Sequence, residues 1–103
     1  MSEFKTIVEC ARPEFVSNLN VSRSQDQGIL EVYIEIKTLS GHITVTLSGF
    51  DDLSEAISQI LLSEHFVISE ELHTGKEFGT VRIECWEDAS YSEYWCDSAT
   101  LCS

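Results

Sequence analysis

The sequence has few basic residues. Its 103 residues include 6 lysines and arginines against 18 aspartates and glutamates, which gives a formal net charge of −12 at pH 7. A nucleic-acid footprint needs a continuous set of Lys and Arg side chains to neutralise phosphates, and six scattered bases cannot form one. We therefore expect no direct contact with nucleic acid, and the same charge repels anionic lipid surfaces.

Glycine-rich loops and long apolar runs are also missing. Only 5 glycines occur, and they form neither a dinucleotide-binding fingerprint nor a phosphate-cradling loop with its lysine. The sequence has no run of about 18 apolar residues that could span a bilayer. Residues 1–5 lack the basic and apolar regions of a signal peptide. These absences predict a cytoplasmic protein in which Cys10, Cys85, Cys96 and Cys102 are free thiols.

No residue pattern indicates a metal, a cofactor or catalysis. Cys96 and Cys102 have five residues between them, wider than the roughly two to four of a typical zinc knuckle. Glu70 and Glu71 would point to opposite faces of a strand, so they do not form a catalytic carboxylate pair. We interpret Cys85 as a small apolar core residue rather than a reactive thiol. We therefore predict no enzyme activity, no metal site and no cofactor.

The first half of the chain reads mainly as strands of a single domain over residues 1–103. Residues 4–10 alternate in the manner of a strand, whereas residues 12–22 fit no single class. Residues 30–37 and residues 43–48 each alternate between apolar and polar, and Ser40-Gly41 lies between these two segments. This pattern predicts a β-hairpin with one face in the core and a tight turn at those two residues.

A helix is predicted after this hairpin. Apolar residues recur there at the spacing of one helical stripe, at Leu53, Ala56, Ile57, Ile60 and Leu61. Asp52-x-x-Glu55 resembles a capping box at the start of the stripe. Two further apolar segments flank residues 73–76, which predicts a second hairpin with Cys85 inside and Trp86 on the outer face.

These elements together predict an α+β fold. We expect an antiparallel sheet of four to five strands, made of the two hairpins and the N-terminal strand. One principal helix would pack on the apolar face of the first hairpin. A short C-terminal helix over residues 91–97 is also expected, because Ser90-x-x-Glu93 matches a capping box.

The negative charge is concentrated in the second half of the chain. Residues 51–103 hold 12 acids and 2 bases, whereas residues 1–50 hold 6 acids and 4 bases. A field of this sign attracts basic protein surfaces and speeds association at low salt. Solubility alone is the alternative reason for such a charge, because a large net charge keeps proteins dispersed.

Aromatic and acidic residues meet in residues 84–96. This segment holds four rings and four carboxylates without a base, at Glu84, Trp86, Glu87, Asp88, Tyr91, Glu93, Tyr94 and Trp95. Two interpretations of the rings are open. They close one end of the core, or they stay exposed and anchor a partner between carboxylates that pair with its Lys and Arg side chains.

We predict from these features a small acidic inhibitor that neutralises a basic partner which itself engages nucleic acid. In size, charge and layout the chain resembles bacterial immunity proteins that silence nuclease toxins and phage anti-defence proteins such as anti-CRISPRs. Carboxylates can occupy the Lys and Arg side chains that would bind phosphate. The eight aromatic and acidic residues of segment 84–96 would form the contact surface of a monomer or weak dimer. The alternatives are an acidic dimeric chaperone or adaptor module without an inhibitory role, and a small enzyme with a histidine or thiol beside a carboxylate.

Overall fold

The fold is mostly β. The computed structural model describes residues 3–23, 28–72 and 80–102, of which 70% are in strands and 11% in a helix. The elements follow in the order β1 (Glu3–Ala11), β2 (Phe15–Arg23), β3 (Leu30–Thr38), β4 (Gly41–Ser48), α1 (Leu53–Leu62), β5 (His65–Leu72), β6 (Val81–Glu87), β7 (Ser90–Cys96) and β8 (Ser98–Cys102).

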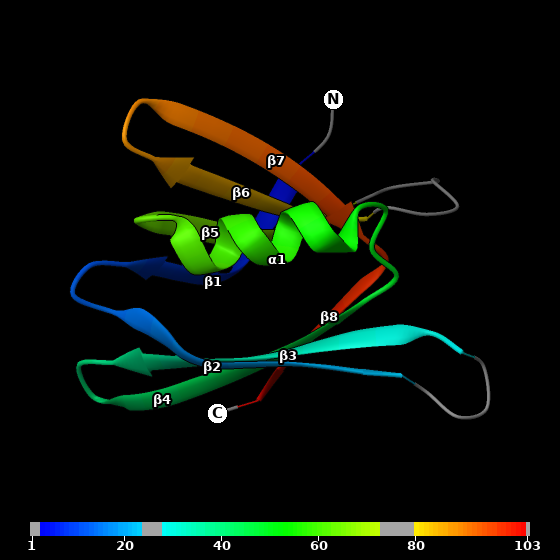
Figure 1. The fold of residues 1–103 in the computed structure, drawn as a ribbon, viewed down its shortest axis with the longest axis horizontal. Coiled ribbons are helices and arrows are strands. Elements are labelled where there is room, and N and C mark those ends of the chain that lie inside the picture. Colours follow the sequence, from blue (N-terminus) through cyan, green and yellow to red (C-terminus); the bar gives the residue numbers. More distant parts are fainter. Residues whose placement is uncertain (1–2, 24–27, 73–79, 103) are drawn as a thin grey trace.

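The strands form two four-stranded antiparallel sheets that lie one above the other (Figure 1). Sheet A has the strand order β1-β5-β6-β7, and sheet B has the order β2-β3-β4-β8. The chain passes from sheet A to sheet B between β1 and β2, returns through α1, and passes to sheet B again between β7 and β8. Both sheets therefore contain strands from both halves of the sequence.

The core lies between the apolar faces of the two sheets. Alternation along β3 and β4 removes five side chains from solvent completely, those of Val32, Ile34, Ile36, Val45 and Leu47. Sheet A contributes buried residues from all four of its strands, including Val8, Phe66, Ile68, Ile83 and Cys96. Each such side chain stabilises the fold by about 1.5–3 kcal/mol relative to an exposed position.

Helix α1 completes this core along sheet A. Its start is the predicted cap, where the Asp52 side chain accepts a hydrogen bond from the Glu55 backbone N–H at 3.3 Å. Ala56 and Ile60 are buried, whereas Leu62 is exposed. The strand in closest contact with α1 is β6, and Figure 1 shows the helix running along the sheet A layer. This contact differs from the predicted packing of the helix on the hairpin β3–β4.

Several predicted elements are confirmed. The N-terminal strand is β1, the first hairpin is β3–β4, and β5 pairs antiparallel with β6. Thr38 pairs with Gly41, so the two loop residues of the first hairpin are Leu39 and Ser40 rather than Ser40 and Gly41. The expected turn at residues 73–76 lies outside the described residues.

The predicted α+β class, with a single sheet on a principal helix, is wrong. The unassigned residues 12–22 contain most of β2, whose bulge between Val16 and Asn18 breaks the apolar alternation. The expected helix over residues 91–97 is instead strand β7 followed by the link to β8. Its capping-box pattern is coincidental, because every residue of β7 pairs with β6. Pairing between distant strands overrides these local signals.

Candidate functional site

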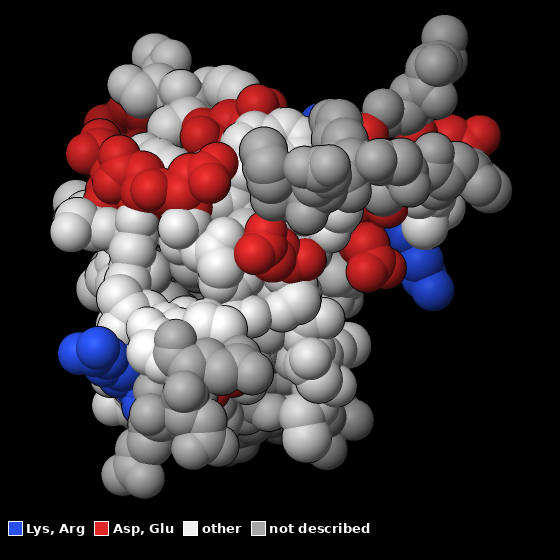
Figure 2. Space-filling view, turned by 90° about the vertical axis from the view of Figure 1, so that its right-hand side faces the viewer, with Lys and Arg blue, Asp and Glu red and all other residues white. Residues whose placement is uncertain are grey.

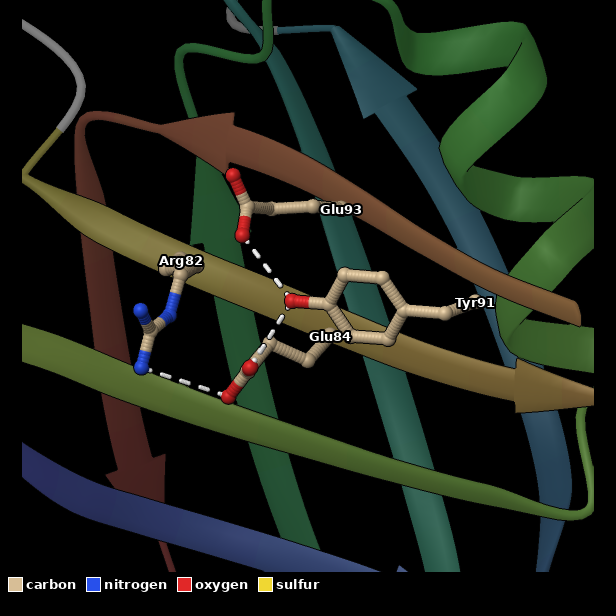
Figure 3. Close-up of polar contacts among 4 residues, drawn as sticks. All are labelled: Arg82, Glu84, Tyr91 and Glu93. Atoms are coloured by element: carbon tan, nitrogen blue, oxygen red, sulfur yellow. Dashed lines mark hydrogen bonds and ion pairs between the residues drawn. The ribbon is translucent and has the colours of Figure 1, made fainter.

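The outer face of sheet A collects the aromatic and acidic side chains. On β6 the residues Val81, Ile83 and Cys85 are buried, so the alternate residues of β6 and their partners on β7 point away from the core. Figure 3 shows four of these outward side chains on one side of β6 and β7, with sheet B behind the strands. We name this outer surface the aromatic-acidic face, formed by Phe4, Glu9, His65, Arg82, Glu84, Trp86, Tyr91, Glu93 and Trp95.

A row of rings crosses this face. The ring centroids of His65 and Trp86 lie 4.8 Å apart in a stacked arrangement, and those of Trp86 and Tyr91 lie 5.3 Å apart at a tilt of 53°. His65 Nε2 lies 2.7 Å from a carboxylate oxygen of Glu9. These contacts join β1, β5, β6 and β7, and each aromatic pair adds about 0.5–1.5 kcal/mol beyond its buried area. These contacts therefore fix the positions of the rings within the folded chain.

Two carboxylates of this face surround one hydroxyl. Glu84 and Glu93 are directly opposite on β6 and β7, and the Tyr91 hydroxyl lies 2.8 Å from Glu84 Oε2 and 2.9 Å from Glu93 Oε2 (Figure 3). Partial burial and hydrogen bonds to the two carboxylates raise the pKa of Tyr91 above its ordinary value. The phenol therefore stays protonated and remains a donor between two like charges.

Arg82 sits beside this carboxylate pair. Its Nη2 lies 3.3 Å from Glu84 Oε1, and its guanidinium carbon lies 3.8 Å above the centroid of the Phe4 ring. The Trp95 ring is 6.1 Å from Phe4 between centroids. The side chain of Arg82 is only 23% exposed, so this cation is already engaged by the chain's own groups.

The acidic residues gather in the layer of sheet A. Among the described residues, its strands, α1 and the links that join them to one another and to sheet B carry Glu3, Glu9, Glu14, Asp51, Asp52, Glu55, Glu64, Glu70, Glu71, Glu84, Glu87, Asp88, Glu93 and Asp97 against the bases Lys5, Arg12 and Arg82. The strands of sheet B carry Glu31 and Glu35 against Arg23 and Lys37. Figure 2 shows the same division on one end of the molecule, where the acidic side chains in view gather mainly on the half formed by the sheet A layer.

The predicted contact residues separate into three places. Glu84, Trp86, Tyr91, Glu93 and Trp95 share the aromatic-acidic face, and the Tyr91 side chain is half exposed. The acids Glu87 and Asp88 lie at the tight turn between β6 and β7, where Asp88 has a positive φ of 51°. The ring of Tyr94 instead points to the other side of β7 and packs on the core.

Sequence reasoning missed the contributions of β1 and β5 to this face. Phe4, Glu9 and His65 come from segments far from residues 84–96, and no local pattern connects them with Trp86 or Arg82. The alternation of β1 would have shown which residues point outward, apart from the bulge between Thr6 and Val8. Knowledge of the strand order in sheet A would have been needed to place them beside β6.

A histidine lies beside a carboxylate at one place on this face, where His65 Nε2 is 2.7 Å from Glu9 Oε2 and the imidazole stacks on Trp86. No three His, Cys, Asp or Glu side chains among the described residues are placed to hold a metal ion. A hollow of about 140 Å³ between α1 and the start of β2 includes Cys10 and Glu64 in its lining. Burial, with a smaller effect from Glu14, raises the pKa of the Cys10 thiol to about 11, so it is not a thiolate at neutral pH.

Two further findings bear on what kind of protein this is. Across the described residues, no helix combines the length and apolar character needed to cross a membrane. Comparison with protein-family models, with curated proteins and with solved structures finds no match. We therefore infer function from the geometry and charge of the chain itself.

Proposed function

We propose that this chain is a cytoplasmic protein-binding inhibitor that covers the phosphate-binding surface of a basic, nucleic-acid-engaging partner. The observation that carries the proposal is the aromatic-acidic face, where the half-exposed Tyr91 ring lies between Trp86 and the carboxylates of Glu84 and Glu93. Rings of this kind supply binding energy at protein interfaces, and the acids beside them select cationic partners.

The surplus of acid supports a cationic partner. The described bases of sheet A are few, and Arg82 is engaged by Glu84 and Phe4. The layer therefore keeps a strong negative potential, which attracts a basic surface and raises its association rate. A nuclease toxin or a nucleic-acid-binding defence complex presents such a surface, since Lys and Arg are what bind phosphate.

A second candidate, an acidic dimeric chaperone or adaptor, draws on a different surface. Leu61 and Leu62 at the end of α1 are 52% and 64% exposed, and Phe15 at the start of β2 is 53% exposed. Leu61 and Phe15 also line the hollow of about 140 Å³. Exposed apolar side chains beside a hollow suit a protein interface. A stable dimer in light scattering that is lost in Leu61→Ser would favour this candidate.

The inhibitor proposal is tested by capture followed by competition. The chain is immobilised and exposed to an extract of its source cell, with the double variant Trp86→Ala, Glu93→Lys as a parallel bait. We expect the unmodified chain to retain a basic nucleic-acid-binding protein that the variant loses. In a second step the chain should displace labelled nucleic acid from that purified partner. A captured protein that keeps its nucleic acid in the presence of saturating chain would contradict inhibition.

A further inference from the structure

Strand β7 is the outer strand of sheet A next to the aromatic-acidic face. The Trp86 carbonyl accepts a hydrogen bond from the Glu64 N–H at 2.9 Å, on the β5 side. In two antiparallel strands, residues directly opposite each other either exchange two backbone hydrogen bonds or exchange none. These two kinds of residue pair alternate along the strands. The pair of Trp86 and Tyr91 is therefore not hydrogen-bonded, and the backbone N–H and C=O of Tyr91 point away from β6.

A hydrogen bond at the other end of β7 shows independently which residues direct their backbone groups away from β6. The Trp95 carbonyl accepts a hydrogen bond from the Asp51 N–H at 3.3 Å, outside the sheet. Tyr91 and Glu93 lie four and two residues before Trp95 on the same strand, so the backbone groups of all three point away from β6. Residue Asp51 closes the outer edge of β7 at Trp95. Within the described ranges, no backbone hydrogen bond from beyond β7 reaches Tyr91 or Glu93.

The acids at this edge determine what can pair with it. Unpaired edges of sheets bind other strands, and like charge is one way that proteins prevent pairing with their own copies. Here Glu93 lies on the edge strand and Glu87 and Asp88 lie at its turn. A second copy of this chain would bring the same negative charges to the edge. A strand that carries Lys or Arg would be attracted instead.

We propose that β7 binds an extended basic segment of the partner by strand addition, in the interval from Tyr91 to Glu93. The inference rests on the proposed function and names the part of the partner that enters the face. Residues of the added strand opposite Tyr91 and Glu93 direct their backbone groups to β7 and their side chains to the aromatic-acidic face. Basic residues at every second position then meet the Glu93 carboxylate and the exposed Tyr91 ring.

The test uses a capped peptide of about eight residues that alternates Lys and Thr, the length of an ordinary strand. Two controls keep its charge: one is N-methylated at the backbone of its lysines and the other at its threonines. Lysine N-methylation removes the donors that would face β7, whereas threonine N-methylation removes donors on the opposite edge. We expect the first control to bind about tenfold more weakly than the parent peptide, the loss expected for two hydrogen bonds, and the second to bind like the parent.

Amide hydrogen exchange of the full chain locates the peptide. Exchange at the Tyr91 and Glu93 amides should slow on binding, while the free edge of β2 in sheet B should not change. If both N-methylated peptides bind like the parent while Glu93→Gln weakens all three, strand addition is wrong and the charge-based function stands. If Glu93→Gln has no effect either, the face itself is not the contact surface. No binding of the parent peptide up to about 1 mM also overturns strand addition.

Discussion

Glu84 and Glu93 face each other across β6 and β7, and the Tyr91 hydroxyl lies within hydrogen-bond distance of both. Like charges placed directly opposite on a sheet repel, which costs stability unless another group compensates. Tyr91 and Arg82 provide that compensation from the two sides. The chain's own groups thus hold the two carboxylates together on the aromatic-acidic face.

Tyr91→Phe tests this relationship. Hydrogen bonds to charged groups are worth about 1.5–3 kcal/mol when buried, so a half-exposed one should lower the free energy of unfolding by about 1 kcal/mol. Urea denaturation measures the change, with Tyr33→Phe on the outer face of sheet B as the matched control. The loss should shrink in a Glu93→Gln background, where only one carboxylate remains. Equal losses in both backgrounds would show that the hydroxyl does not couple the two acids.

Gly49→Ala tests the link between the layers. Gly49 has a φ of +78°, and a Cβ there would collide with the Asp97 carboxyl group. Gly28 has a similar φ of +68°, but a Cβ would meet only the Arg23 side chain at 3.4 Å. Both alanine variants therefore carry the backbone penalty of about 1 kcal/mol, and Gly49→Ala should lose about 1–3 kcal/mol more from the collision. Equal unfolding midpoints for the two variants would contradict the close approach.

Ile60→Ala tests whether α1 belongs to the core. Ile60 is 1% exposed, whereas Leu62 two residues later is 64% exposed. Removal of the buried side chain should cost about 2–5 kcal/mol, and Leu62→Ala should stay within about 0.5 kcal/mol of the unmodified chain. Thermal denaturation followed by circular dichroism measures both. A small loss for Ile60→Ala would show that the helix is peripheral.

Thiol reactivity tests the two-sheet core. Burial raises the pKa of the Cys10 thiol to about 11 and those of Cys85 and Cys96 to about 12, from 9.0, while Cys102 is exposed. At pH 8 the folded chain should be alkylated at Cys102 alone, and at all four cysteines in denaturant, as mass spectrometry can count. Fast alkylation of Cys85 in the folded chain would contradict its burial.

The same thiol shifts weaken the fold in alkali. The unfolded chain releases its thiol protons near pH 9, whereas the folded chain holds them until about pH 11 or 12. Above pH 9 the folded state therefore binds more protons than the unfolded state. The buried thiols therefore make their full contribution to the free energy of unfolding below pH 9. That contribution is lost as the pH rises from about 9 to about 12.

Local sequence signals predicted the regular strands and the helix, because their apolar periodicity is unbroken over residues 30–36, 43–47 and 53–60. They failed where pairing partners decide the structure. The bulge in β2 shifts its apolar residues out of alternation. In β7, residues Tyr91, Tyr94 and Trp95 have helical spacing, yet pairing with β6 makes the segment a strand.

The candidate site was predicted in part for the same reason. Trp86, Tyr91 and Glu93 are close in sequence, and the alternation of β6 already placed Trp86 outward. The positions of Glu9 and His65 depend on the order of strands in sheet A. That order is set by contacts between residues more than fifty positions apart, which no local pattern contains.

Association kinetics with the captured partner test the central claim most directly. Glu93→Lys on the aromatic-acidic face is compared with Glu31→Lys on the outer face of sheet B, a change of equal charge, over a series of salt concentrations. The account predicts that Glu93→Lys slows association and flattens its dependence on salt, whereas Glu31→Lys stays close to the unmodified chain. Equal rates and equal salt dependence for the two variants would show that the partner does not recognise this face.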